Sequence, residues 1–245
     1  MEHRAPEKQR GQGKQMRAAL DGIVAVVGNY GSGKTEVSVN LAMRGRSQGL
    51  KVSIADLDVV NPYFRTREAR GVLSGLGIEV IVPPEKYLQA DLPILNPAIA
   101  GMIRRPRQLT LLDVGGDGVG ARVLGALADS LSSTPVHVLQ VVNPFRPHTE
   151  TVEGCLSVRD GIEKASRMLI SGIIGNAHLI DETTVNDIYR GYDFVQALSE
   201  ISGLPLEYIA VADELLGRLD KEYFSCPLLP VRRQLVPPWK RACPI

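Results

Sequence analysis

The sequence is poor in cysteine and nearly balanced in charge. Its cysteines, Cys155, Cys226 and Cys243, are too few and too scattered for a disulfide framework or a zinc site, and they fit a reducing cytoplasm. The 28 Lys and Arg residues face 27 Asp and Glu residues, which leaves a net charge of +1. That balance argues against nucleic-acid binding through bulk charge. These shortages exclude disulfide-stapled secreted domains, zinc modules and strongly basic nucleic-acid binders.

Long apolar runs are also missing. No stretch approaches the roughly 20 apolar residues that a membrane-spanning helix needs. Residues 1–21 are basic but have no apolar segment, so we expect a disordered lead-in rather than a signal peptide. No linker-like stretch divides residues 22–245, whose tail is rich in Pro and Arg. The sequence therefore predicts a cytoplasmic protein with one domain over 22–245.

Short apolar runs alternate with longer amphipathic stretches over most of the length. The pattern predicts strands at 23–27, 51–55, 78–82, 109–112, 136–142, 169–174, 206–211 and 228–231, and helices at 33–46, 93–104, 119–131, 149–166, 183–201 and 214–220. Strands that are apolar throughout and separated by helices indicate an α/β fold: a mostly parallel, doubly wound sheet of about seven or eight strands with helices on both faces. Ligands of such sheets bind at the carboxyl ends of the strands.

One glycine-rich stretch carries the clearest chemical signal. It fits the phosphate-loop (P-loop) pattern G-x-x-x-x-G-K-[ST] and reads Gly28, Asn29, Tyr30, Gly31, Ser32, Gly33, Lys34, Thr35. In this pattern backbone N–H groups wrap a polyphosphate, the lysine reaches the outer phosphates, and the Thr35 hydroxyl holds Mg²⁺. A helix follows, with Glu36 in its first turn, and its N-terminal dipole favours the phosphates. The stretch 28–36 is therefore the predicted nucleotide site, with Lys34 also stabilising charge during catalysis.

Acidic residues follow two of the predicted strands. Asp56 and Asp58 are two positions apart, so that one could hold a Mg²⁺-bound water while the other orients an attacking water. Asp113 ends the fourth strand, where a carboxylate supports Mg²⁺. With Gly116 it forms the D-x-x-G pattern of a loop that senses the terminal phosphate. We therefore expect metal binding by Thr35 and Asp113, nucleotide contact by Gly116, and a division of metal binding and water positioning between Asp56 and Asp58.

Two later strand ends carry asparagine. Asn176 is the better candidate for pairing with an adenine edge, whereas Asn143 is equally compatible with a simple turn. The chain lacks the N-K-x-D pattern that reads guanine, so ATP is favoured over GTP.

Together these motifs resemble the MinD/ParA branch of P-loop NTPases and the CobQ/CobB-like nucleotide-binding domains, which belong to the SIMIBI class. The order of motifs matches from about residue 23 to 211. The resemblance implies a mostly parallel sheet, ATP and Mg²⁺ binding, and slow hydrolysis controlled by a partner or by homodimerisation. It also matches Asp58 to the water-positioning aspartate of the family and puts Asp56 nearer the metal.

One position departs from the family. Members with a deviant P-loop carry an early lysine that reaches across a nucleotide-sandwich dimer, and Asn29 stands at that place. An asparagine supplies no positive charge. Either another cation substitutes, with Arg65, Arg67 and Arg70 as candidates, or such dimerisation is weak or absent. The alternative for the three arginines is that they form a solvent-exposed face of a helix and have no role at the site.

Three functions are compatible with these observations. The favoured one is an ATPase switch whose partner meets residues 62–106, where aromatic residues lie beside the acidic pair. The second is an ATP-dependent ligase or kinase of the CobQ/CobB or dethiobiotin-synthase kind, with an acceptor near Tyr63 and Arg65. The third is a non-catalytic ATP sensor.

Overall fold

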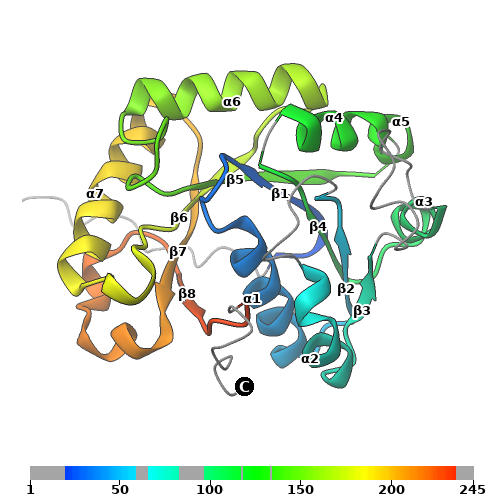
Figure 1. Ribbon diagram of the computed structural model, residues 1–245, viewed down its shortest axis with the longest axis horizontal. Coiled ribbons are helices and arrows are strands. Elements are labelled where there is room, and N and C mark those ends of the chain that lie inside the picture. The colour runs from blue at the N-terminus through cyan, green and yellow to red at the C-terminus, as the bar shows by residue number, and fades with distance from the viewer. Residues whose placement is uncertain (1–19, 59–65, 83–96, 117, 133, 236–245) are drawn as a thin grey trace, which may run out of the picture.

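The computed structural model describes residues 20–58, 66–82, 97–116, 118–132 and 134–235. Their strands form one sheet of eight, in the order β3-β2-β4-β1-β5-β6-β7-β8, and every pairing is parallel (Figure 1). The strands are β1 (Gly22–Gly28), β2 (Val52–Asp56), β3 (Glu79–Ile81), β4 (Leu109–Asp113), β5 (Val136–Val142), β6 (Gly172–Gly175), β7 (Leu206–Ala212) and β8 (Leu228–Val231).

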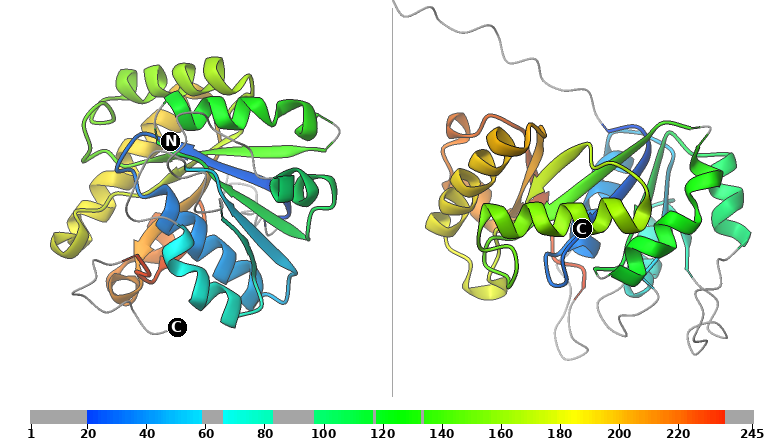
Figure 2. Two further views of the ribbon diagram at one scale, coloured as in Figure 1. Left: turned by 45° about the vertical axis from the view of Figure 1, so that its right-hand side comes forward. Right: turned by 90° about the horizontal axis from the view of Figure 1, so that it is seen from above.

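Helices cover both faces of this sheet (Figures 1 and 2). The α-helices are α1 (Lys34–Ser47), α2 (Arg70–Gly75), α3 (Pro97–Arg104), α4 (Gly118–Ala126), α5 (Ala128–Leu131), α6 (Val152–Ser166) and α7 (Val185–Ser202). Short 3₁₀ segments are η1 (Thr66–Ala69), η3 (Ile180–Glu182), η4 (Asp213–Arg218) and η5 (Lys221–Tyr223).

Alternate side chains of the central strand enter different cores. Val24 and Val26 of β1 pack with α1 and α2 on one face, whereas Ile23 and Ala25 pack with α3, α4 and α5 on the other. Helices α6 and α7 extend the second face over β6 and β7. Because β1 is covered by helices on both faces of the sheet, side chains on both of its faces are buried, and this explains why its sequence is apolar throughout. The predicted doubly wound α/β fold is confirmed, and the sheet is parallel throughout.

Several element boundaries differ from the sequence-based expectation. The stretch expected to form a strand from residue 169 pairs only from Gly172, and Leu169 is 79% exposed. The helix expected at 119–131 is broken into α4 and α5, and the one expected at 214–220 is the 3₁₀ segment η4. Helix α6 starts at Val152 because the Thr151 side chain caps it by accepting from the Gly154 N–H. The helix face suggested for the three arginines corresponds, over the described residues, to η1 and the start of α2.

The topology brings distant segments to one edge. Strand β1 lies between β4 and β5, and the helix after β1 covers the opposite face from the helices after β4 and β5. Asp56 and Asp113 pair in register at the ends of β2 and β4. The carboxyl end of β1, where the covering helices change from one face of the sheet to the other, is the switch point at which open α/β sheets bind ligands. Within the described ranges, no helix is both long and apolar enough to cross a membrane.

Candidate functional site

The P-loop leaves β1 in a conformation that depends on glycine. Gly31 and Gly33 have φ values of 72° and 88°, in the left-handed region that favours glycine. A side chain on Gly33 would also collide with the amide of Asn176, and a Cβ on Gly28 would lie 2.5 Å from the Val141 carbonyl oxygen. Helix α1 starts directly after Gly33, so the loop closes around the N-terminus of that helix.

Lys34 lies at the centre of the loop. Its side chain is buried, and its Nζ donates a hydrogen bond to the Asn29 carbonyl oxygen at 3.0 Å. Gly116 lies against it: a Cβ there would be 2.6 Å from Nζ and 2.9 Å from the Tyr30 Cα. The D-x-x-G loop after β4 and the P-loop after β1 are therefore in direct contact, as their motifs predict.

The acidic residues separate into an inner pair and one residue at the cavity. Asp113 is fully buried, and burial, together with the neighbouring charge of Asp56, raises its pKa to about 7. Thr66 Oγ1 donates to it at 2.8 Å, and the Thr35 side chain also hydrogen-bonds it. Asp58 is the acidic residue of the three that lines the cavity.

Asp56 is also fully buried, behind the cavity. Its Oδ2 pairs with Arg67 Nε at 3.1 Å, and its Oδ1 accepts the Asp58 backbone N–H at 3.0 Å. Arg67 is therefore no solvated arginine: its side chain is 21% exposed, and its NH2 group is buried without a partner among the described residues. Arg70 is exposed, as expected for a residue on a solvent-exposed helix face, and Arg65 lies outside the described residues.

This arrangement fits a nucleotide-bound Mg²⁺ better than a metal held by the protein alone. The described residues contain no group of three His, Cys, Asp or Glu side chains placed to hold a metal ion. Mg²⁺ in such sites uses few protein oxygens, because phosphate oxygens and waters complete its shell. The Thr35 hydroxyl, with Asp113 behind it, is the oxygen set that would face such an ion. Asp56 would act on it only from behind, through the Asp58 backbone and Arg67.

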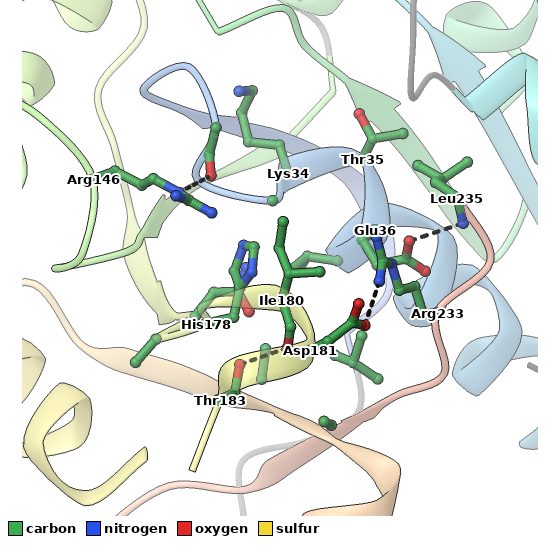
Figure 3. A pocket seen from close by; sticks show the side chains of 18 of the residues that line it. Lys34, Thr35, Glu36, Arg146, His178, Ile180, Asp181, Thr183, Arg233 and Leu235 are labelled. Carbon is green, nitrogen blue, oxygen red and sulfur yellow. Dashed lines mark hydrogen bonds and ion pairs between the residues drawn. The ribbon is translucent and has the colours of Figure 1, made fainter. Parts of the chain in front are cut away.

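A cavity of about 450 Å³ opens beside the P-loop (Figure 3). At one end it is lined by Gly31, Gly33, Lys34, Thr35, Asp58 and Gly116. The rest of the lining combines apolar side chains with polar ones. The apolar residues are Ile180, Ile188, Ala210, Ala212, Val231 and Leu235, and the polar ones include Asp181, Thr183, Glu214 and Arg233. A cavity with a phosphate-binding loop on one side and apolar surface with a few polar groups on the other suits a nucleotide.

The two predicted asparagines hold loops together. Asn176 is buried, and its Nδ2 donates to the Ser32 carbonyl oxygen at 2.7 Å, so its amide nitrogen supports the P-loop. Asn143 is buried too, and its Nδ2 donates to the His178 carbonyl oxygen at 3.0 Å. Asn143 was predicted either to pair with an adenine edge or to form a turn, and its contacts are those of the second, structural role. The adenine contact of Asn176 stays a prediction, and the side-chain oxygen and the second N–H of the amide are the groups that would make it.

Glu36 binds the C-terminal part of the chain. Its carboxylate accepts the backbone N–H groups of Gln234 at 2.7 Å and Leu235 at 3.0 Å, and the Asn40 side chain adds a third bond. Burial raises its pKa above the ordinary value, and these hydrogen bonds oppose the rise. Glu36 itself lines the cavity, so its predicted place in the nucleotide site stays a prediction. It also fixes the backbone of Gln234 and Leu235, and Leu235 lines the cavity too.

We expect Glu36→Gln to lower the free energy of unfolding by about 1–2 kcal/mol, because an amide offers one acceptor oxygen to two buried N–H donors. Urea denaturation monitored by circular dichroism measures this. Glu200→Gln, at an exposed position of α7, is the matched control and should be neutral. A loss of the same size in both variants would contradict the role of Glu36.

His178 lies in the cavity wall beside Gly33, and sequence reasoning missed it. Its Nε2 is buried with no hydrogen-bond partner in the described part of the chain. Burial, and then the positive charges of Arg146 and Arg233, lower its pKa from 6.5 to about 4. The imidazole is therefore neutral at pH 7.

This pKa shift predicts an acid-sensitive stability. The unfolded chain takes up a proton near pH 6.5 and the folded chain only near pH 4, so the free energy of unfolding falls as the pH drops through this window. The contribution is on the order of 3 kcal/mol. Urea titrations of the wild type and of His178→Gln at several pH values measure it, and the variant should lose less stability on acidification. Parallel curves for the two proteins would disprove this source of acid sensitivity.

Comparison with known proteins finds similarity in structure alone. No protein-family model matches the sequence, and no curated protein matches it either. Among solved structures, the chain resembles the cell division protein FtsY of Thermotoga maritima, with a TM-score of 0.55 and 21% identity over 78% of this chain and 61% of that one. It also resembles the signal recognition particle 54 kDa protein of Aeropyrum pernix K1 in complex with GDP, with a TM-score of 0.51 and 21% identity over 76% of this chain and 40% of that one.

A third similar structure is the septum site-determining protein MinD of Pyrococcus horikoshii OT3 complexed with Mg-ADP. The TM-score is 0.50 and the identity 19%, over 80% of this chain and 83% of that one. The chain spans about three fifths of the length of the FtsY protein it matches. These likenesses establish a shared fold, a parallel α/β sheet, and in this chain the P-loop lies at the carboxyl end of β1.

Proposed function

We propose that this protein binds Mg-ATP in the cavity beside the P-loop and hydrolyses it slowly, as a cytoplasmic switch. The observation that carries the proposal is the convergence of Lys34, Gly116 and Asp58 on one cavity from three different strand ends. This set combines a phosphate-binding lysine, a glycine loop placed to respond to the terminal phosphate, and a carboxylate beside them.

Hydrolysis transfers the terminal phosphoryl group to water. The water oxygen attacks the γ-phosphorus, the bond to the β–γ bridging oxygen breaks, and the products are ADP and inorganic phosphate. Asp58 orients the water from the cavity wall, and Lys34 balances the charge that develops on the phosphate oxygens. Mg²⁺, when bound with the nucleotide, supplies further charge neutralisation, and Thr35 backed by Asp113 would hold it.

The base is proposed to be adenine, because the chain lacks the guanine-reading N-K-x-D pattern and has Asn176-Ala177-His178-Leu179 after β6. The structural relatives make this a necessary test, since one was solved with GDP and another with Mg-ADP. Titration calorimetry with ATP, ADP, GTP and GDP in Mg²⁺, followed by phosphate-release assays with and without EDTA, addresses it. Tighter binding of guanine nucleotides would overturn the assignment of ATP, and the absence of any nucleotide binding would overturn the function.

Control by a partner belongs to the same proposal, as does a single nucleotide-binding domain over residues 22–245. Within the proposed partner surface, residues 66–82 and 97–106 are described, whereas Tyr63 and residues 83–96 lie outside the described residues. The described part includes Thr66 and Arg67, whose side chains hold Asp113 and Asp56. A partner that moves η1 would therefore act directly on both inner carboxylates. A pulldown comparing nucleotide-free protein with protein held by a non-hydrolysable ATP analogue tests for it, and no difference in bound partners would count against it.

A further inference from the structure

The side chain of Asn29 has a defined structural partner. Its Nδ2 donates to the Pro147 carbonyl oxygen at 2.7 Å. Pro147 belongs to residues 143–149, which follow β5 and which we call the β5 loop. At the place where a MinD-like P-loop would carry an early lysine, this chain therefore binds its own neighbouring loop.

The β5 loop is held in one shape by its own polar groups. Asn143 is fully buried, and its Oδ1 accepts the Phe145 N–H at 3.1 Å. Thr149 is buried as well, and its Oγ1 donates to the carbonyl oxygens of Asn143 at 2.7 Å and Arg146 at 3.1 Å. Both ends of the loop are therefore fixed, and Arg146 lies between them.

The side chain of Arg146 reaches across to the P-loop (Figure 3). Its Nε donates to the Gly31 carbonyl oxygen at 3.2 Å, and the guanidinium lines the same cavity as Lys34. This is the one hydrogen bond that the guanidinium makes within the described part of the chain, so both terminal NH₂ groups keep their donors for a ligand. A guanidinium anchored through Nε presents those donors in the planar arrangement that matches phosphate oxygens.

We propose that Arg146 contacts the phosphates of the bound nucleotide from within the same chain and supplies the positive charge that Asn29 does not. The inference rests on the proposed function, because it assigns a residue of that site. Lys34 alone leaves most of the charge of a triphosphate to be balanced by other groups, and an arginine beside the P-loop adds a second fixed cation. The lowered pKa of His178, to which Arg146 contributes, is consistent with positive charge inside this cavity. Asn29 and the β5 loop keep the guanidinium in place.

The test compares Arg146→Ala and Arg146→Lys with the wild type, and uses Arg159→Ala as the control, since Arg159 pairs with Asp160 on α6. We expect Arg146→Ala to bind ATP about tenfold more weakly and to turn over about 100-fold more slowly. Arg146→Lys should recover part of the affinity, because it restores a charge without the planar donors. If Arg146 only tied the β5 loop to Gly31, alanine and lysine would be equally impaired, and that result would overturn the proposal.

A mixing experiment separates contact within one chain from contact across a dimer. Lys34→Ala and Arg146→Ala are combined in equal amounts, and turnover per protomer is measured over a range of protein concentrations. An arginine that acts within its own chain gives no recovery of activity and no dependence on concentration. Recovery would show that Arg146 acts on a partner's nucleotide and would overturn the proposal.

Failure of the proposed function gives a different result from failure of this inference. If the wild type binds no nucleotide in calorimetry, both are overturned. If the wild type binds and hydrolyses ATP and Arg146→Ala matches it in affinity and turnover, the assignment of Arg146 is wrong and the proposed function stands.

Discussion

Replacing Lys34 with alanine is expected to weaken nucleotide binding by about 100-fold or more and to abolish turnover. The residue is buried, its Nζ donates to the Asn29 carbonyl oxygen, and Gly116 of the neighbouring loop lies against it. The variant therefore loses the cation at the centre of the phosphate-binding loop, where charge-assisted hydrogen bonds are strongest. Calorimetry with ATP and ADP in Mg²⁺ measures the affinity, and phosphate release measures turnover.

The control for this variant concerns folding, since the change also removes a buried side chain. The free energy of unfolding and the circular dichroism of Lys34→Ala should stay close to those of the wild type in the absence of nucleotide. Lys51→Ala, at an exposed position before β2, should leave nucleotide binding unchanged. Equal ATP affinity in Lys34→Ala and wild type would refute the site.

Local sequence patterns were sufficient for the framework of the site. Strand β1 and the start of α1 follow from an apolar run, a glycine-rich loop and a helical pattern that are contiguous in sequence. The meeting of Gly116 with Lys34 was predictable as well, because parallel strands bring their carboxyl ends to one edge. Asn176 was placed correctly at that edge, although its amide nitrogen holds Ser32.

Several contacts around the site join residues that are far apart in the sequence, and no local sequence pattern predicts them. Glu36 meets Gln234 because β8 and the residues after it pack in the same core as α1, and Arg146 meets Gly31 because β5 lies beside β1. Arg67 illustrates the same limit: its sequence neighbourhood is that of an exposed basic segment, and its burial is decided by the ion pair with Asp56. Asn29 in place of a lysine left two alternatives, a substitute cation or weak dimerisation, and the candidates named for the cation were Arg65, Arg67 and Arg70 rather than Arg146.

Replacing Asp58 with asparagine is expected to separate binding from turnover. The side chain lines the cavity, and its Oδ1 lies against the D-x-x-G loop, 3.2 Å from where a Cβ on Gly115 would be. Because the amide is isosteric, the loop geometry and the ATP affinity should stay within about twofold of the wild type, whereas turnover should fall by about 100-fold or more once the carboxylate that orients water is lost. Single-turnover phosphate release at saturating ATP measures the chemical step directly.

Asp56→Asn provides the contrast that makes this prediction specific. Asp56 is fully buried and paired with Arg67, so its neutralisation leaves a largely buried cation without its partner and should cost about 2 kcal/mol of folding free energy, since relief of the repulsion with Asp113 offsets part of the loss. Asp58→Asn should keep the stability of the wild type and lose turnover, whereas Asp56→Asn should lose stability first. If Asp58→Asn instead hydrolysed ATP at the wild-type rate, the water would be oriented by another group, and the carboxylate at the cavity wall would have no part in the reaction. The two aspartates are two positions apart in sequence, yet one faces the cavity and the other is held behind it, and this pair of variants measures that difference.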